Sequence, residues 1–287
     1  MKSATICLTV IGLLLISSVA VALEPLALYD NFQGKTLDPV KWFGGQSTDS
    51  GMVTLETSRL MKNETVLKSK ALSLSNRSYA STGSDSDHST AATRIFFSNG
   101  SNIKTIEATV LVKKIQVPEC NTNTYATDVR ARIGGAFFNT GTPTSGNSTN
   151  DVWGQITVGR TLDSEDPADT LRVYAKVYRC TDDSCSTTTW VGSEDPQDLG
   201  TVKLNKKVKL RITWDPDRNE FIFQKGKSEE FVVHCGVSDT SGPGGLNGGM
   251  KRLEIQEFLP NCMSDPRPVG YIEASFDNVM INELPPP

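Results

Sequence analysis

Hydrophobic and polar residues alternate along several segments of the chain. Successive side chains of a β-strand point to opposite faces of its sheet, so this period of two predicts strands with one buried and one polar face. No segment carries the sustained period of about 3.6 residues that is typical of an amphipathic helix. The clearest apolar rows are Ile106, Ala108, Val110 and Val112; Leu171, Val173, Ala175 and Val177; and Val208, Leu210, Ile212 and Trp214.

Turn-forming residues separate the predicted strands. Between Trp214 and Glu220, Pro216 presets φ, and the Asp and Asn side chains beside it tolerate turn geometry, so a hairpin is expected there. Phe221 and Phe223 then resume the alternation. Strands with one buried and one polar face, joined by polar loops, predict an all-β fold, an antiparallel two-sheet β-sandwich.

The N-terminal segment has the three parts of a secretory signal. Lys2 supplies a positive charge, residues 6–16 form an apolar run, and Ala-Val-Ala at 20–22 is a small-x-small cleavage motif. A membrane anchor is the alternative, but the run is short for a bilayer span of about 20 residues. We therefore expect a signal peptide at 1–22 and a secreted protein, periplasmic or extracellular, with no membrane span in the mature chain.

Length and charge narrow the functional classes. Residues 23–284 are long enough for a single large β-sandwich domain, and the three prolines at 285–287 are expected to form a frayed tail. The net charge of -4 and the isoelectric point near 5.4 show no basic footprint. Nucleic acid is therefore not an expected partner.

Five cysteines follow the predicted cleavage site, and disulfides are the default in an oxidising compartment. Cys180 and Cys185 flank the turn-rich sequence Thr-Asp-Asp-Ser, so we expect them to close a hairpin loop. Cys235 is expected to pair with Cys262, which leaves Cys120 without a partner.

Both ends of the mature chain resemble one superfamily. Residues 29–34 (Tyr-Asp-Asn-Phe-Gln-Gly), followed by Leu-Asp-Pro at 37–39 and by Trp42, resemble the opening of concanavalin A-like lectin/glucanase domains. These domains include laminarinase-type glycoside hydrolases of family 16 and related bacterial sugar-binding modules. Residues 272–279 (Ile-Glu-Ala-Ser-Phe-Asp-Asn-Val) resemble the last strand of the same superfamily. The resemblance implies a jelly roll with two curved sheets, whose concave face commonly binds glycans.

The catalytic signature of family 16 is missing. That signature, Glu-x-Asp-x-Glu, places its carboxylates on the same face of a strand, as retaining hydrolysis requires. The closest segment, 254–257 (Glu-Ile-Gln-Glu), lacks the central Asp, and its two Glu side chains are expected to face opposite sides. We interpret this segment as a solvated edge, so the sequence favours a non-catalytic protein without excluding an enzyme.

The middle of the chain carries a candidate binding surface. If the segments 128–138, 152–158 and 171–177 form neighbouring strands, their non-core sides combine aromatic rings with cationic and amide donors, as sugar recognition requires. The alternative is an ordinary solvent-facing sheet, because long stems and aromatic side chains also suit strands. The candidate contacts are Arg130, Arg132, Trp153, Gln155, Arg172, Tyr174 and Lys176.

The resemblance also implies a metal. In the similar family an acidic residue on the last strand often helps to bind a structural Ca²⁺ ion, and Asp277 occupies the matching place. Together these expectations favour a secreted, non-catalytic carbohydrate-binding protein whose partner is a polysaccharide or glycan. The alternatives are a polysaccharide hydrolase or lyase with a non-standard site, and a structural or adhesive envelope protein.

Overall fold

The computed structural model describes most of the chain from residue 25 to residue 282. The predicted signal peptide and the proline tail lie outside the described residues. No described residue belongs to an α-helix, and no described helix is long and apolar enough to cross a membrane. The described ranges are 25–44, 53–55, 58–80, 87–192, 196–245, 250–263 and 267–282.

One of the two antiparallel sheets has eight strands. Its order is β15-β14-β13-β7-β17-β5-β4, and β1 also pairs with β17. Its strands are β1 (Leu26–Asp30), β4 (Ser58–Leu67), β5 (Leu72–Ala80), β7 (Thr105–Gln116), β13 (Val208–Asp215), β14 (Glu220–Lys225), β15 (Phe231–His234) and β17 (Val269–Asn282).

The other sheet has nine strands. Its order is β11-β10-β9-β8-β16-β6-β2, with β12 paired to β10 and β3 paired to β6. A short 3-10 helix, η1 (Gly100–Asn102), precedes β7. The strands are β2 (Trp42–Phe43), β3 (Val53–Leu55), β6 (His88–Phe97), β8 (Asp128–Asn139), β9 (Asp151–Thr161), β10 (Thr170–Cys180), β11 (Thr188–Trp190), β12 (Gln197–Lys203) and β16 (Arg252–Pro260).

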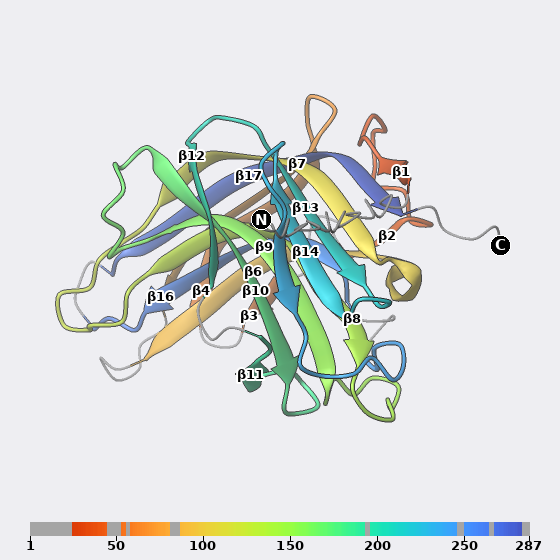
Figure 1. Ribbon diagram of the computed structural model, residues 1–287. Helices are drawn as coiled ribbons and strands as arrows, with labels where there is room; N and C mark the ends of the chain where they lie inside the picture. The colour runs from red at the N-terminus through yellow and green to blue at the C-terminus, as the bar shows by residue number, and fades with distance from the viewer. Residues whose placement is uncertain are drawn as a thin grey trace, which may run out of the picture.

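The hydrophobic core lies between the two sheets, which face each other as layers (Figure 1). All three apolar rows of the sequence are buried there, and the predicted hairpin joins β13 to β14. The predicted fold class, an all-β antiparallel sandwich, is confirmed. Burial of these rows supplies the main driving force for closing the two layers.

The opening motif forms an aromatic cluster at one end of the sandwich. Trp42 is fully buried, and its indole Nε1 donates a hydrogen bond to Asp30 Oδ2 at 2.7 Å. The ring centroids of Tyr29 and Phe32 lie 5.1 and 5.6 Å from that of Trp42. Because β1 pairs in the eight-stranded sheet and β2 in the nine-stranded one, this cluster links the two layers.

The disulfides confirm one expectation and correct another. Cys180 and Cys185 are bonded as predicted. The pairing of Cys235 with Cys262 is wrong, because Cys262 is bonded to Cys120 and Cys235 is buried and free. Cys120 follows β7 and Cys262 follows β16, whereas Cys235 follows β15 at the far edge of the eight-stranded sheet. Strand order, which sequence spacing does not reveal, decides the pairing.

The segment 254–257 is not a solvated edge. β16 pairs with β8 on one side and with β6 on the other, and Glu254 and Glu257 are both fully buried. The two side chains do face opposite sides, as their spacing requires. Glu257 points toward the other sheet and accepts a hydrogen bond from the Ser78 hydroxyl of β5. Burial raises the pKa of the Glu257 carboxyl to about 8.

This raised pKa makes a prediction about stability. The pKa of the Glu257 carboxyl is near 4.5 in the unfolded chain and about 8 in the folded protein. The contribution of the protonated carboxyl to the free energy of unfolding is therefore complete below the unfolded pKa and is lost as the pH rises through the folded pKa. Between these two pKa values the free energy of unfolding should fall by up to about 1.4 kcal/mol per pH unit. Glu257→Gln removes this slope, as measured by urea unfolding at a series of pH values. An unchanged slope contradicts the prediction, and Glu229→Gln, in an exposed loop, is the control.

Candidate functional site

The three segments predicted to build a surface are neighbouring strands. β8 pairs with β9, and β9 pairs with β10, so their non-core sides form one continuous outer face on the nine-stranded sheet. Tyr174 lies opposite Thr157, Thr157 opposite Arg132, and Arg132 opposite Glu254 of β16. The candidate residues therefore lie in cross-strand rows, where facing side chains are in contact range.

A buried carboxylate organises the centre of this face. Glu254 lies among three guanidinium groups, with its Oε2 atom 2.7 Å from Arg132 Nε and 2.6 Å from Arg252 Nε. Its Oε1 atom is 3.2 Å from Arg94 Nε. Burial alone would raise the pKa of Glu254, but the three positive charges hold it well below its usual range. A buried charge persists only when it is compensated in this way.

Part of the predicted surface is closed. The gap beside Arg132, Trp153, Gln155 and Arg252 is too narrow for a water molecule. Arg132 Nη1 donates to Gln155 Oε1 at 2.6 Å, and the Trp153 ring is stacked on Tyr178 with centroids 6.0 Å apart. Trp153 is only 3% exposed, so in this structure it offers no ring face to a sugar. Its role and those of Arg132 and Gln155 stay predictions.

Three of the other predicted residues border an open groove of about 470 Å³. Arg172, Tyr174 and Lys176 of β10 form one wall, and the groove continues over the end of β9 and the loop that follows it. Four acidic side chains line it as well, so it combines both signs of charge with an aromatic ring. These acidic residues are Asp128, Asp163, Glu165 and Asp198.

Hydrogen bonds fix the side chains of this groove. Arg130, below the surface, donates from Nη1 to the Tyr174 hydroxyl at 3.2 Å and to Asp128 Oδ2 at 2.8 Å. Arg172 Nη1 donates to Asp198 Oδ2 at 2.8 Å. Gly159 lies between Arg130 and Arg172 in the register, and a Cβ atom there would be 2.6 Å from the Cβ of Arg130. Glycine at 159 thus leaves room for the Arg130 side chain.

Lys176 has an unusual environment. Its Nζ atom lies 5.3 Å from the ring centroid of Tyr174 and 5.5 Å from that of Trp190. Within the described part of the chain no ion pair with a carboxylate is found for it. Burial, with help from the charge of Arg130, lowers the pKa of Lys176 to about 8, and burial raises the pKa of Tyr174.

Trp190 lies beside the groove, next to Lys176, but was not predicted from the sequence. It ends β11, pairs with Tyr178 of β10, and is 41% exposed. The sequence carries a signal that could have identified it, because Trp190 is the first aromatic residue after the Cys180–Cys185 hairpin. A short return strand after a closed hairpin must pair with the strand that precedes it, which places the indole beside β10.

Asp277 lies on β17 of the other sheet. Its Oδ2 atom is 4.0 Å from the ammonium of Lys207, and its Oδ1 atom accepts a hydrogen bond from the Asn278 backbone N–H. No group of three or more His, Cys, Asp or Glu side chains that could hold a metal ion is found among the described residues. The side chains around Asp277 therefore do not fit a Ca²⁺ ion by themselves, and calcium stays a prediction that depends on backbone oxygens.

The fold of this chain is similar to solved structures, although no related sequence is found. No family model and no curated protein matches the chain. A family 7 alginate lyase in complex with substrate is 10% identical, with 91% of this chain and 100% of that chain covered and a TM-score of 0.42. A β-porphyranase from the human gut bacterium Bacteroides plebeius is 10% identical, with coverage of 91% and 94% and a TM-score of 0.38.

A lectin from Griffonia simplicifolia is 10% identical, with 77% of this chain and 92% of that chain covered and a TM-score of 0.26. The similar structures thus include both enzymes and a lectin.

The network around Glu254 predicts a large effect on stability. Glu254→Ala leaves three neighbouring guanidinium groups without their shared carboxylate, and we expect a loss of about 3–5 kcal/mol in the free energy of unfolding. Glu254→Gln keeps the volume and removes only the charge, so it should also destabilise the protein. Urea unfolding measures both, with Glu229→Ala expected to change stability by less than about 0.5 kcal/mol. A loss below about 1 kcal/mol for both Glu254 variants contradicts this account.

Proposed function

We propose that this chain is a secreted, non-catalytic protein that binds a polysaccharide in the groove along β10. The observation that carries the proposal is the position of Lys176, held between the rings of Tyr174 and Trp190 at the border of an open groove. Two disulfides among the described residues suit an oxidising compartment and support the proposal of secretion.

The chemistry of the groove matches that of a sugar chain. The exposed ring of Trp190 can cover the apolar C–H face of a pyranose, and Tyr174 adds a second aromatic contact. Lys176 can receive an acidic group of the glycan, because its charge has no carboxylate partner among the described residues. Arg172 and Asp198, already fixed to each other, can orient hydroxyl groups by donating and accepting hydrogen bonds.

Two substitutions test the binding proposal. We expect Trp190→Ala and Lys176→Ala each to raise the Kd of the groove for an acidic polysaccharide about five- to thirtyfold, since each removes a contact worth roughly 1–2 kcal/mol. Affinity electrophoresis in gels that contain acidic or neutral polysaccharides measures the change. Lys227→Ala, on an exposed loop of the other sheet, is the matched control. If both groove variants migrate like wild type in every gel that retards wild type, the groove is not the site.

A polysaccharide lyase is the second candidate, because Tyr174, Lys176 and Arg172 meet in one groove. In β-elimination a base removes the proton beside a uronate carboxylate, the electron pair forms a carbon–carbon double bond, and the glycosidic C–O bond breaks. The neutral amine of Lys176 would accept that proton, and the Tyr174 hydroxyl would protonate the leaving oxygen. Arg172 would neutralise the carboxylate.

This alternative predicts a pH profile. Lys176 acts as a base only without its proton, so activity should rise as the pH approaches the lowered pKa of about 8. Lys176→Arg keeps the positive charge but cannot lose its proton, so it should abolish cleavage while binding is retained. Ultraviolet absorbance of the unsaturated product and release of reducing ends measure cleavage. No product from any uronate polysaccharide would rule out the lyase and leave the binding proposal intact.

A further inference from the structure

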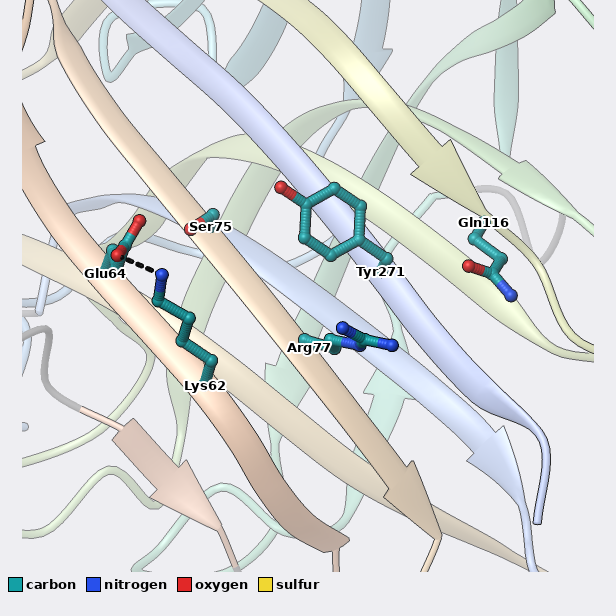
Figure 2. Close-up of a pocket in the computed structure, with 6 residues that line it drawn as sticks. All are labelled: Lys62, Glu64, Ser75, Arg77, Gln116 and Tyr271. Carbon is teal, nitrogen blue, oxygen red and sulfur yellow. Dashed lines mark ion pairs between the residues drawn. The ribbon is translucent and has the colours of Figure 1, made fainter. Parts of the chain in front are cut away.

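A second groove lies on the opposite side of the sandwich. It occupies about 380 Å³ on the outer face of the eight-stranded sheet, where strands β4, β5, β7 and β17 lie side by side. Figure 2 shows the six side chains that line it, and they rise from these four strands. They are Lys62, Glu64, Ser75, Arg77, Gln116 and Tyr271.

Strand register arranges this groove around one aromatic ring. Tyr271 of β17 lies opposite Arg77 of β5 on one side and opposite Gln116 of β7 on the other. Arg77 in turn lies opposite Lys62 of β4, so one cross-strand row carries an ammonium, a guanidinium, a phenol and an amide. Figure 2 shows the ring of Tyr271 with its face toward the viewer.

The polar groups around the ring differ in how firmly they are engaged. The Tyr271 hydroxyl donates to Glu273 Oε2 at 3.4 Å, and Glu273 also pairs with Lys113. Lys62 pairs with Glu64 at 2.6 Å. Arg77 is exposed and forms no ion pair with any carboxylate in the described part of the chain. The guanidinium of Arg77 is therefore available to an external anion.

The same surface continues along the strands. Tyr79, two residues after Arg77, has the guanidinium of Arg267 at 5.6 Å from its ring centroid. Tyr79 lies opposite Val269, so Tyr79 and Tyr271 are diagonal neighbours at about 7–8 Å between Cα atoms. Around the two tyrosines this face carries the cations Lys62, Arg77, Lys113, Lys114 and Arg267 and the carboxylates Glu64 and Glu273. The excess of positive charge complements an acidic chain.

We propose that this face is a second binding site for an acidic polysaccharide, and that the protein is therefore bivalent. One sugar stacks on Tyr271 while its carboxylate or sulfate pairs with Arg77, and the next sugar contacts Tyr79. The site shares only its ligand class with the groove along β10. Because the two sites lie on the outer faces of opposite sheets, one protein molecule can join two polysaccharide chains.

Matched variants separate the two sites. Calorimetric titration with a short acidic oligosaccharide is expected to give two sites for wild type, and one site each for Tyr271→Ala and Trp190→Ala. Tyr271→Phe keeps the ring and should retain both sites. The Kd of the second site should rise at least about tenfold in Arg77→Ala. Circular dichroism and thermal melting confirm that each variant is folded.

Cross-linking supplies an independent readout. Wild type should turn a solution of long acidic polysaccharide turbid, whereas either single-site variant should bind without producing turbidity. If the titration of Tyr271→Ala still shows two binding sites, the second site is ruled out. It is also ruled out if wild type binds at only one site and Trp190→Ala abolishes that binding. A single site lost only in Tyr271→Ala would support this face and overturn the groove. Dimerisation without glycan that depends on Tyr271, seen by light scattering, would identify the face as a contact between copies instead.

Discussion

The outer face of the nine-stranded sheet depends on the ion pairs that the Glu254 carboxylate forms with three arginines. This carboxylate faces Arg132 on one neighbouring strand and Arg94 on the other, and it neutralises charges that would otherwise repel one another at close range. Arg132 then holds Gln155 of the next strand. Through these contacts the Glu254 carboxylate orients side chains as far away as β9. It is buried, and an unpaired charge at a buried position would destabilise the fold.

The two halves of this face differ because their partners differ. Around Trp153 the surface is closed, because Arg252 lies over the indole ring, Tyr178 stacks on it, and Arg132 is hydrogen-bonded to Gln155. Around Lys176 the rings of Tyr174 and Trp190 flank the ammonium, which forms no ion pair with a carboxylate among the described residues, and an open groove adjoins it. A polar sheet face is thus not uniformly available to a ligand. Contacts between neighbouring side chains decide which part of the face is open.

Alternation along the sequence predicted the fold well and the site only in part. The apolar rows of β7, β10 and β13 are buried because a period of two leaves a strand no other way to cover them. Strand neighbours are not encoded in that period, so the pairing of Cys262 and the central place of β16 could not be derived from it. Trp153 lies on the outer face, as the alternation indicates, but it is buried there by Tyr178 and Arg252, whose strands the sequence could not place beside it.

The hairpin between β10 and β11 holds Trp190 in place for the sugar contact that we propose. The Asp182 carboxylate accepts hydrogen bonds from the backbone N–H groups of Ser184, Ser186 and Thr187, and the Cys180–Cys185 disulfide closes the same loop. The chain that leads to the indole is thus ordered before any sugar arrives. Little conformational entropy remains to be lost on association, and contact energy at this ring is converted into affinity more fully than it would be on a loose loop.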